Sequence, residues 1–526
     1  MKKWQPLIKL RQDNQAVSPW SRPRGPGYSL YLNFMNSCKK CYLCCLLGLS
    51  LSTMEGHSQE SNPMGPLEIR SGSAEYNGRE IWLKGDVHVQ HSLGEIKAKN
   101  LVVSSPEAGE RRLNLSLLKM EGDVSIEMHK GVQLECQQAR VDSVALQGNF
   151  EGNSQAPDVV YTHLKAGDPS ALKIKARRMQ LTLARENQSK MLLVGEVSAE
   201  EQIEAFHQQL QLKADRADYK RLSPDETAPK GSLLLTAYPE SFCKVKKESG
   251  EEIRAKSMRY NLATQQLTLT QAEGILMAGV GEWIHFRADE ILWEPNRHTL
   301  RLRGAVQLSQ EARFTLKTDH ELEVVQSSQG IKTLFSSHDT EMTYWEGHAA
   351  LSHKVMVYGP VMIDHEQLKV WLSSPKTTQG ETVADKQVYL EDSFGDMYAD
   401  EVRLQLKRQG KQLELGEVVL EGAVKILNRF DGHLQESSSV LHYALADQVD
   451  YRPELNEIML SSAPGKRVLF LDKVNKVQMS APQLKIIRGE TQDQTVIQGM
   501  GDVRFTFIEA ELNQLQKKFA AKKENR

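Results

Sequence analysis

Histidines are the residues of this chain whose spacing could support metal chemistry. His88 and His91 lie three positions apart, and His348 and His353 form a second candidate pair. On a β-strand, residues i and i+3 point to opposite faces, so His88 and His91 cannot converge on one ion unless a turn intervenes. We therefore interpret these histidines as structural, and we predict neither a metal nor another cofactor.

Cysteines cluster near the N-terminus. Within eight residues the chain carries Cys38, Cys41, Cys44 and Cys45. Their spacing mimics a zinc or redox motif. However, two lysines followed by about a dozen apolar residues are typical of a secretory signal peptide, and the run is short for a transmembrane helix. An exported chain would keep only Cys136 and Cys243, either as one disulfide or as two buried thiols; we favour the thiols.

Motifs for catalysis and for nucleic-acid binding are missing from the sequence. Gly279-Val280-Gly281 lacks the third glycine and the following helix of a dinucleotide loop. The sequence holds no Gly-x-Ser-x-Gly, no His-Glu-x-x-His and no phosphate loop. The formal net charge is −2 at pH 7, and lysine and arginine are spread among aspartate and glutamate. We predict that the protein is not an enzyme and binds no nucleic acid.

A short phrase recurs along the chain: a glycine, usually an acidic residue, and a valine, set among alternating apolar and polar residues. In the first copy, from Ile81 to Val89, odd positions are apolar or glycine and most even positions are polar, which is the period of a β-strand. A glycine within such a pattern indicates a bulge, a bend or a close backbone approach. The copies begin at Gly85, Gly122, Gly195, Gly304, Gly416, Gly422 and Gly501. This recurrence predicts a repetitive, all-β architecture.

A second phrase, alanine followed by an acidic residue, travels with the first and opens many of the predicted strands. The complete couplet occurs at 74–89, 288–308 and 399–427. The strands between these points are rich in Val, Leu and Ile with polar residues between them, which suits a sheet with one wet face and one apolar face. Another layer or a ligand must cover the apolar face. Periodicity does not distinguish a closed β-sandwich from an open, folded-over sheet with an apolar trough.

Composition and pattern divide the chain into six segments. Met35 is our preferred start of the natural chain, the rival being a long signal n-region, and a lipoprotein would need a small residue before Cys44 or Cys45 that is absent. The predicted segments are 1–34, a non-native or extended N-terminal region; 35–58, a signal peptide; 67–325, a β array; 326–385, an irregular connecting region; 386–507, a second β region; and 508–526, an amphipathic basic helix.

Several of these residues resemble a known family. The run from Ala74-Glu75-Tyr76-Asn77-Gly78 through Leu83-Lys84-Gly85-Asp86-Val87-His88-Val89, with a further strand through Ala98, resembles the OstA-type domain of LptA-like periplasmic lipopolysaccharide-transport proteins. The segments 288–308, 399–427 and 481–507 resemble it more loosely. The resemblance implies an elongated antiparallel β-jellyroll, or β-taco, whose apolar interior holds lipid A acyl chains. It also implies that copies join edge to edge between the inner and outer membranes.

From this resemblance we predict a non-enzymatic periplasmic or membrane-associated protein that binds lipopolysaccharide or lipid A and takes part in outer-membrane biogenesis. Its other partners are expected to be envelope transport proteins that add to its edge strands. The alternative is a structural β-repeat scaffold of the cell envelope that binds no lipid. The residues expected to face lipid are Leu83, Val87, Val89, Phe286, Ile291, Trp293, Leu302 and Val306.

The two ends of such an array carry unpaired backbone groups. Leu512, Leu515 and Phe519 are spaced as on one face of a helix, directly after the last predicted strand. We predict that this helix folds back and caps the C-terminal edge, which leaves the strand near Leu67 to Ile69 as the edge that docks a partner sheet.

Overall fold

The computed structural model describes the chain from residue 68 onward in a series of segments. They are residues 68–104, 117–153, 158–164, 168, 170–185, 191–223, 227–279, 281–310, 313–345, 352–383, 385–392, 395–409, 412–428, 442–473, 476–487 and 496–507. These belong to one compact unit, Asn62–Arg526. The predicted N-terminal region (1–34), signal peptide (35–58) and C-terminal helix (508–526) lie outside the described residues.

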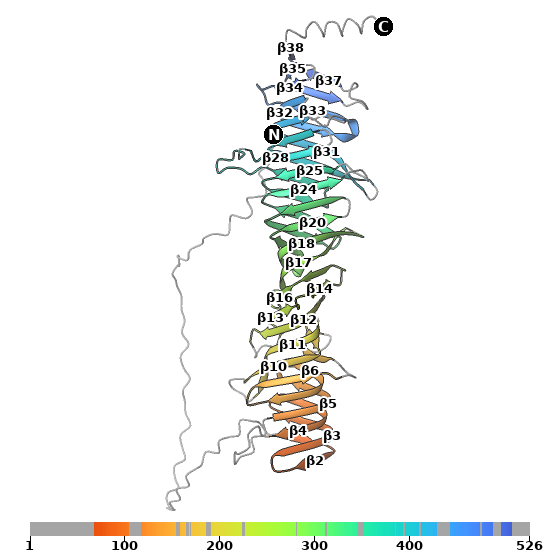
Figure 1. The fold of residues 1–526 in the computed structure, drawn as a ribbon, viewed down its shortest axis with the longest axis vertical. Helices are drawn as coiled ribbons and strands as arrows, with labels where there is room; N and C mark the ends of the chain where they lie inside the picture. Colours follow the sequence, from red (N-terminus) through yellow and green to blue (C-terminus); the bar gives the residue numbers. More distant parts are fainter. Residues whose placement is uncertain are drawn as a thin grey trace, which may run out of the picture. The chain divides into compact units, whose positions relative to one another are not determined.

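The described part of the chain is almost entirely antiparallel β-sheet, and it forms an elongated stack of strands as the sequence predicts (Figure 1). Thirty-eight strands are connected by pairing into one sheet. Strand pairing divides this sheet into two faces, because the long strands bend and contribute one half to each face. The long strands are β3 (Glu80–His91), β4 (Gly94–Ser104), β5 (Leu117–Met128), β6 (Val132–Asp142), β11 (Leu192–His207), β12 (Leu210–Arg221), β17 (Gln266–Gly279), β18 (Glu282–Glu294), β31 (Gln412–Asn428) and β32 (His442–Arg452).

The remaining strands belong to one face each. The first face adds β2 (Ser73–Tyr76), β7 (Gln147–Glu151), β10 (Arg178–Arg185), β13 (Gly231–Thr236), β16 (Ser257–Asn261), β19 (Thr299–Arg303), β22 (Glu321–Ser327), β23 (Gly330–Ser336), β26 (Val361–Asp364), β27 (Lys369–Ser373), β30 (Glu401–Gln409), β33 (Glu457–Ser461), β36 (Gln483–Ile487) and β37 (Val496–Met500). The second face adds β1 (Glu68–Arg70), β8 (Val159–His163), β9 (Leu172–Ala176), β14 (Cys243–Lys247), β15 (Glu252–Ala255), β20 (Val306–Gln310), β21 (Phe314–Thr318), β24 (Thr340–Trp345), β25 (Ser352–Val357), β28 (Val388–Asp392), β29 (Gly395–Ala399), β34 (Val468–Asp472), β35 (Val477–Ala481) and β38 (Arg504–Phe507).

Helical structure among the described residues is limited to single 3₁₀ turns between strands. These turns are η2 (His129–Gly131), η3 (Pro295–Arg297) and η4 (Pro453–Leu455). Their proline or glycine residues and the left-handed residues His298 and Asn456 close tight hairpins at the ends of strands. No described helix is long and apolar enough to cross a membrane.

The glycine phrase marks the corner between the two faces. At Gly85–Asp86 and Gly122–Asp123 two consecutive residues have positive φ, and the pairing register shifts there by a bulge. The same pair of conformations occurs at Gly304–Ala305 and Gly422–Ala423. A bulge bends a strand and increases its twist, and glycine reaches positive φ without steric cost. The predicted bend is therefore confirmed at these four copies, where it carries the chain from one face to the other.

Two copies of the glycine phrase do not lie at the corner. Gly195 and Gly416 are skipped by the pairing of β10 with β11 and of β30 with β31, so they lie at bulges inside the first face. The alanine-acidic phrase also differs from its expected place at strand starts. Ala288-Asp289 lies at the bend inside β18, where the Asp289 N–H donates to the Gly304 carbonyl (2.9 Å). Only a small side chain fits inside so tight a bend, and Ala288 is 2% exposed.

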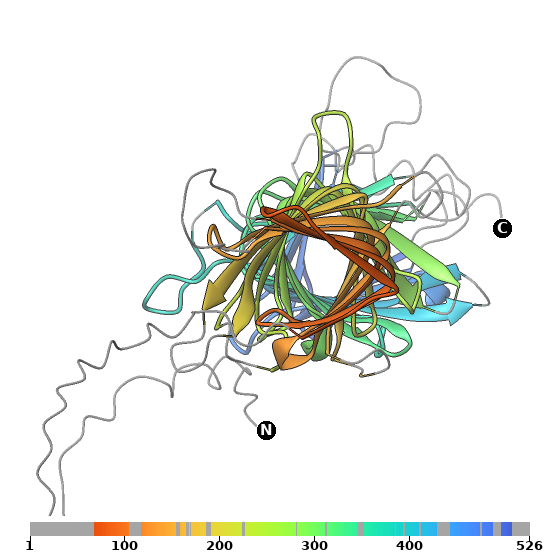
Figure 2. The same cartoon turned by 90° about the horizontal axis from the view of Figure 1, so that it is seen from below.

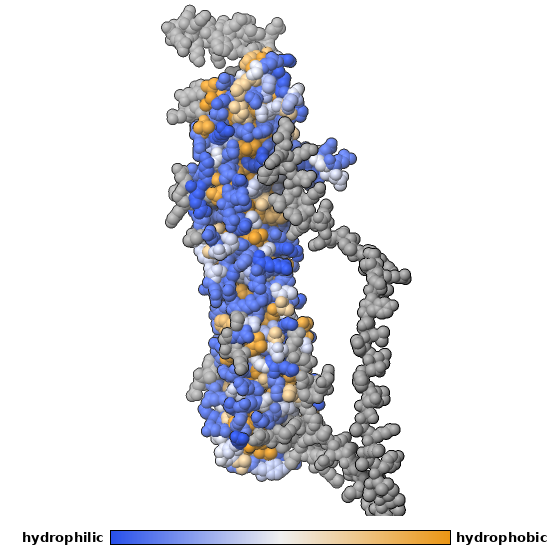
Figure 3. All heavy atoms as spheres, turned by 180° about the vertical axis from the view of Figure 1, so that it is seen from behind, coloured by the Kyte–Doolittle hydropathy of each residue, from blue (hydrophilic) through white to orange (hydrophobic). Residues whose placement is uncertain are grey.

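The core lies between the two faces (Figure 2). Because side chains alternate along a strand, every second residue points inward, and these inward residues form two core clusters. The first runs from Leu83 to Leu334 and the second from Val357 to Leu484. The surface seen in Figure 3 is largely hydrophilic with separate apolar patches. The sheet thus has one surface toward solvent and one apolar surface toward the core, as the alternation predicts.

Residues 326–385 differ in part from the irregular connection that the sequence predicts. Five short strands, β23 to β27, continue both faces through this stretch among the described residues. They have four to seven residues each, too few to produce a clear alternating run. The two core clusters nevertheless separate here, between Leu334 and Val357. A loop with one isolated bridge, Lys376 with Thr382, follows β27.

One smaller prediction, the buried thiols of Cys136 and Cys243, is confirmed, and two local elements complete the fold. Asn77 and Gly78 lie in the hairpin that joins β2 to β3, and the Asn77 side chain accepts the N–H groups of Arg79 and Glu80. Residues 200–212 form a hairpin, with β11 and β12 on the two sides of a turn at 208–209. Cys136 and Cys243 are buried free thiols, and burial raises the pKa of each to about 12.

Candidate functional site

All eight residues predicted to face lipid lie in the first core cluster. Their side chains are 0–3% exposed. Leu83, Val87 and Val89 lie together on β3. The other five lie on β18, β19 and β20, where Ile291 pairs with Leu302 and Trp293 pairs with Leu300. The structure thus places them inside, in two groups far apart along the stack, while their contact with lipid stays a prediction.

The exposed fraction of these side chains indicates whether the interior is an open trough or a packed core, which periodicity does not distinguish. Side chains that line a water-filled trough would be accessible, whereas these eight are covered by protein. At the level of the first core cluster, the interior is therefore a packed core. Entry of a ligand there requires the two faces to separate on the side opposite the corner.

On that side, the hairpin ends of the two faces meet, and we call this line the seam. Hydrogen bonds between described residues cross it. The Leu192 N–H of the first face donates to the Ser92 carbonyl of the second (2.9 Å). His207 Nδ1 lies 2.7 Å from the Tyr260 hydroxyl, and Gln326 Nε2 donates to Glu251 Oε1 (2.6 Å). The partners are distant in sequence, because sheet twist brings the hairpins of one face opposite those of different strands on the other.

Buried histidines concentrate along the second-face side of this seam. His91, His163 and His207 are the last residues of β3, β8 and β11, and each is at most 9% exposed. Burial lowers the pKa of each to about 4, so all three are neutral near pH 7. The Leu93 N–H donates to His91 Nδ1 (3.2 Å), which fixes that nitrogen as an acceptor within the hairpin.

The second core cluster is less tightly covered. Half-buried apolar side chains flank it, and several lie on the seam side of their strands rather than at the corner. They include Met397, Leu404, Leu406, Leu415, Ile426, Tyr451, Ile486 and Ile497. Removing apolar surface from water stabilises a protein by about 25 cal/mol per Å². The surface that these side chains leave open to water would contribute this free energy if a bound apolar chain covered it. This section offers the more accessible apolar surface.

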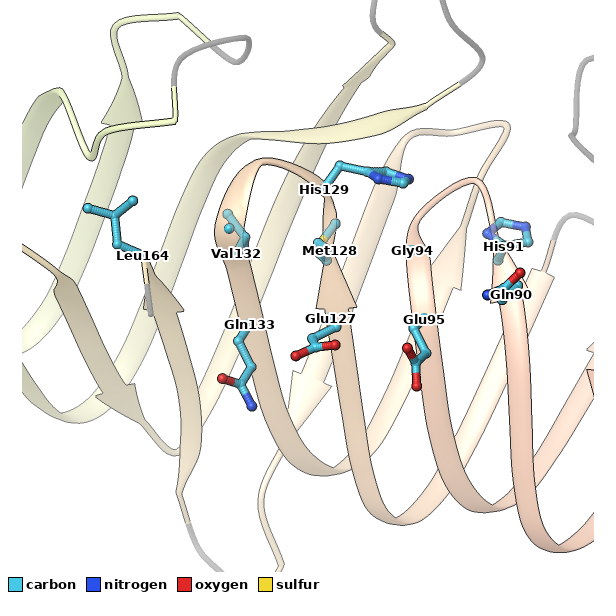
Figure 4. A pocket seen from close by; sticks show the side chains of 11 residues that line it. Gln90, His91, Gly94, Glu95, Glu127, Met128, His129, Val132, Gln133 and Leu164 are labelled. Carbon is cyan, nitrogen blue, oxygen red and sulfur yellow. The ribbon is translucent and has the colours of Figure 1, made fainter. Parts of the chain in front are cut away.

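A groove of about 620 Å³ lies across β3 to β8 on the second face (Figure 4). Its lining mixes charged and amide side chains, including Glu95, Glu127 and Gln133, with few apolar ones. Glu95 accepts hydrogen bonds from Lys97 and His88 (both 2.8 Å), and these contacts lower the pKa of the Glu95 carboxyl. The groove therefore combines these polar side chains with apolar surface, to which Met128, Val132 and Leu164 contribute.

Metal chemistry finds no support among the residues that the structure describes, where no cluster of three or more potential ligands occurs. His88 contacts Glu95 on the outer surface, whereas His91 is buried. The two therefore lie on opposite faces of β3, as the strand period predicts. His348 lies outside the described residues.

Comparison with known proteins finds similarity among solved structures. No family model matches the chain, and no curated protein matches it. Among solved structures, the chain is similar to LptH, the LptA-homologous periplasmic component of the lipopolysaccharide transport device of Pseudomonas aeruginosa. The similarity covers 25% of this chain and 81% of that one, with 13% sequence identity and a TM-score of 0.20.

Proposed function

We propose that this protein is a non-enzymatic lipid carrier of the periplasm that holds acyl chains between its two faces. One observation supports the proposal above others: inward apolar residues continue from strand to strand through two long core clusters. An acyl chain needs only a continuous apolar surface and makes no directional bonds. Passive transfer along such a surface requires no catalytic group.

Lipopolysaccharide, or its lipid A part, is the lipid that we propose. The OstA-type phrases of the sequence support this choice. So does the separation of an apolar interior from a hydrophilic exterior, since acyl chains and sugars need opposite environments (Figure 3). Under this proposal, acyl chains first contact the half-buried side chains of the second core cluster. Movement into the first cluster then requires the seam to open.

Partner proteins are proposed to add strands at the ends of the stack. Among the described residues, β1 and β2 at one end pair only with β3, and at the other end β37 pairs with β36 and β38 with β35. Their other edges leave backbone N–H and C=O groups available for another sheet. Joined in this way to envelope transport proteins, the chain would form part of a bridge toward the outer membrane.

The packed first cluster favours a second candidate function. Side chains that are 0–3% exposed already have full van der Waals contact, so they gain little from a lipid. A structural scaffold of the envelope would keep this core closed permanently. The two functions differ in whether lipid ever reaches the inward residues.

Photo-crosslinking in cells tests the proposal. A photoreactive residue at Leu406, in the second cluster, and another at Leu302, in the first, should both capture lipopolysaccharide. Matched controls are Lys407 and Arg303, the next residues on the same strands, whose side chains are exposed. Capture by the inward positions alone supports lipid transport. Crosslinks only to protein at all four positions would reject the carrier and favour the scaffold.

A further inference from the structure

Polar side chains with unusual surroundings lie inside the first core cluster, on the seam side of β8 and β12. Tyr161 and His163 are inward residues of β8 and are both 0% exposed. Tyr219 and Arg221 are inward residues of β12, 1% and 5% exposed. The Tyr161 ring lies 6.3 Å from that of Tyr219 and 6.5 Å from that of His163.

Two of these groups lack hydrogen-bond partners within the described chain. The Tyr161 hydroxyl has none, and neither ring nitrogen of His163 makes a hydrogen bond of normal geometry, although the Thr227 backbone approaches the ring. Leaving a buried polar group unsatisfied costs about 1–3 kcal/mol. Native structures retain such a group where a function, a water or a ligand satisfies it.

Charge indicates which ligand would satisfy them. The Arg221 guanidinium, which donates to the Val194 carbonyl (3.2 Å), carries a permanent positive charge. Burial, followed by this charge, lowers the pKa of His163 to about 4, so the imidazole is neutral and retains one N–H donor. A cation beside hydroxyl and N–H donors matches the oxygens of a carboxylate or phosphate.

Apolar neighbours surround these donors. Tyr161 pairs with Leu134 on β6 and Ile174 on β9, and His163 pairs with Val132 and Leu172. All four neighbours are 0–1% exposed. A ligand whose charged oxygens reach Arg221 would therefore place its remaining atoms against aliphatic side chains. That combination fits an amphiphile with one anionic group and an apolar chain.

We propose that Tyr161, His163 and Arg221 form a binding site for the carboxylate or phosphate group of an amphiphile whose chain lies along the interior. This inference rests on the proposed lipid-carrier function and adds a polar recognition site to it. The site lies behind the seam, between the contact of Ser92 with Leu192 and that of His207 with Tyr260. Ligand entry accompanies separation of the two faces there.

Titration calorimetry of the full chain tests the site with dodecanoate, dodecyl phosphate and uncharged dodecyl maltoside, each below its critical micelle concentration. At least one anionic amphiphile should bind about tenfold or more tightly than the maltoside. Tyr161→Phe and Arg221→Gln should each remove most of this difference. Tyr389→Phe, which alters a hydroxyl outside the site that already contacts Glu391 and Asp396, should leave it unchanged. Preference for the phosphate points to a phosphorylated lipid, and preference for the carboxylate to a fatty acid.

Other results would overturn the site in distinguishable ways. Equal binding of all three amphiphiles by wild type and Tyr161→Phe rejects the site while the carrier function stands. Binding of none rejects both. Thermal unfolding without ligand adds an independent readout, since Tyr161→Phe should leave the midpoint unchanged or raise it. A lower midpoint with unchanged binding would mean that a structural water holds the hydroxyl, and the site would be rejected.

Discussion

At the scale of single residues, the contact of His207 with Tyr260 holds the two faces together. Tyr260→Phe keeps the ring but leaves His207 Nδ1 buried without its partner at 2.7 Å. We expect a loss of about 1–2 kcal/mol in unfolding free energy, the cost of one unsatisfied buried group. Chemical denaturation of the variant checks this. Tyr76→Phe, at a residue that is 58% exposed, serves as the control and should change little. Equal stability of both variants would mean that the contact does not hold the seam.

The three buried histidines predict a dependence of stability on pH. Their pKa values lie near 4 when folded and near 6.5 when unfolded, so between these values the unfolded chain binds more protons. Stability should therefore be constant above about pH 6.5 and fall as pH decreases toward about 4, by roughly 2–3 kcal/mol per histidine. Urea denaturation across this range measures the loss.

His91→Gln isolates one contribution to this dependence. The variant has no imidazole to titrate and should lose less stability on acidification than the wild type does. Gln90→Ala changes an exposed, uncharged residue next to His91 and should keep the wild-type slope. An unchanged slope for His91→Gln would show that its burial does not control the acid response.

At the scale of elements, the backbone conformation at the corner determines whether one strand can contribute to both faces. Gly422 has φ +78°, and a Cβ there would lie 2.5 Å from Asp400 Oδ2. Gly465 has nearly the same backbone, φ +86°, with nothing within 4 Å. Alanine should cost about 1–2 kcal/mol at either position for its left-handed backbone, and more at Gly422 because Asp400 must move.

Hydrogen exchange of β30, β31 and β32 measures this difference locally, since a long array need not unfold in one step. Gly422→Ala should speed exchange around the corner more than Gly465→Ala speeds it around its own loop. If both variants protect these strands as the wild type does, the corner tolerates a side chain. The close approach of Gly422 to Asp400 would then not be required for the bend.

The sequence predicts this architecture well where the signal is local. Alternation along β3 and β18 is sufficient to identify the inward side chains, and glycine within that alternation identifies the bends. The seam lacks such a signal, because His207 and Tyr260 are 53 residues apart, and Glu251 and Gln326 are 75 apart. Their meeting depends on the accumulated twist of the strands between them. The local signal in the sequence is a histidine at the end of each of the strands β3, β8 and β11. That these histidines lie along the seam follows only from the strand pairing.

At the scale of the whole molecule, hydrogen bonds close the seam beside the first core cluster, and the described part of the stack ends in strands that pair along one edge. The C-terminal strands expose apolar side chains, with Val496 55% and Phe505 53% exposed. At the other end β2 is short and exposed along its length, and Tyr76 is 58% exposed. Edges of this kind pair with other sheets unless they are covered.

Removing residues 508–526 tests whether the predicted C-terminal helix covers one of these edges. Without a cap, β38 and β37 could pair with β1 and β2 of another copy, so the truncated chain should self-associate end to end. Sedimentation velocity should then show concentration-dependent oligomers that the full chain lacks. Adding Phe505→Lys to the truncated chain should restore the monomer, because a charged edge opposes strand pairing. A truncated chain that sediments as the full chain does would mean that this segment is not a cap, and we would assign it to contact with a membrane or a partner.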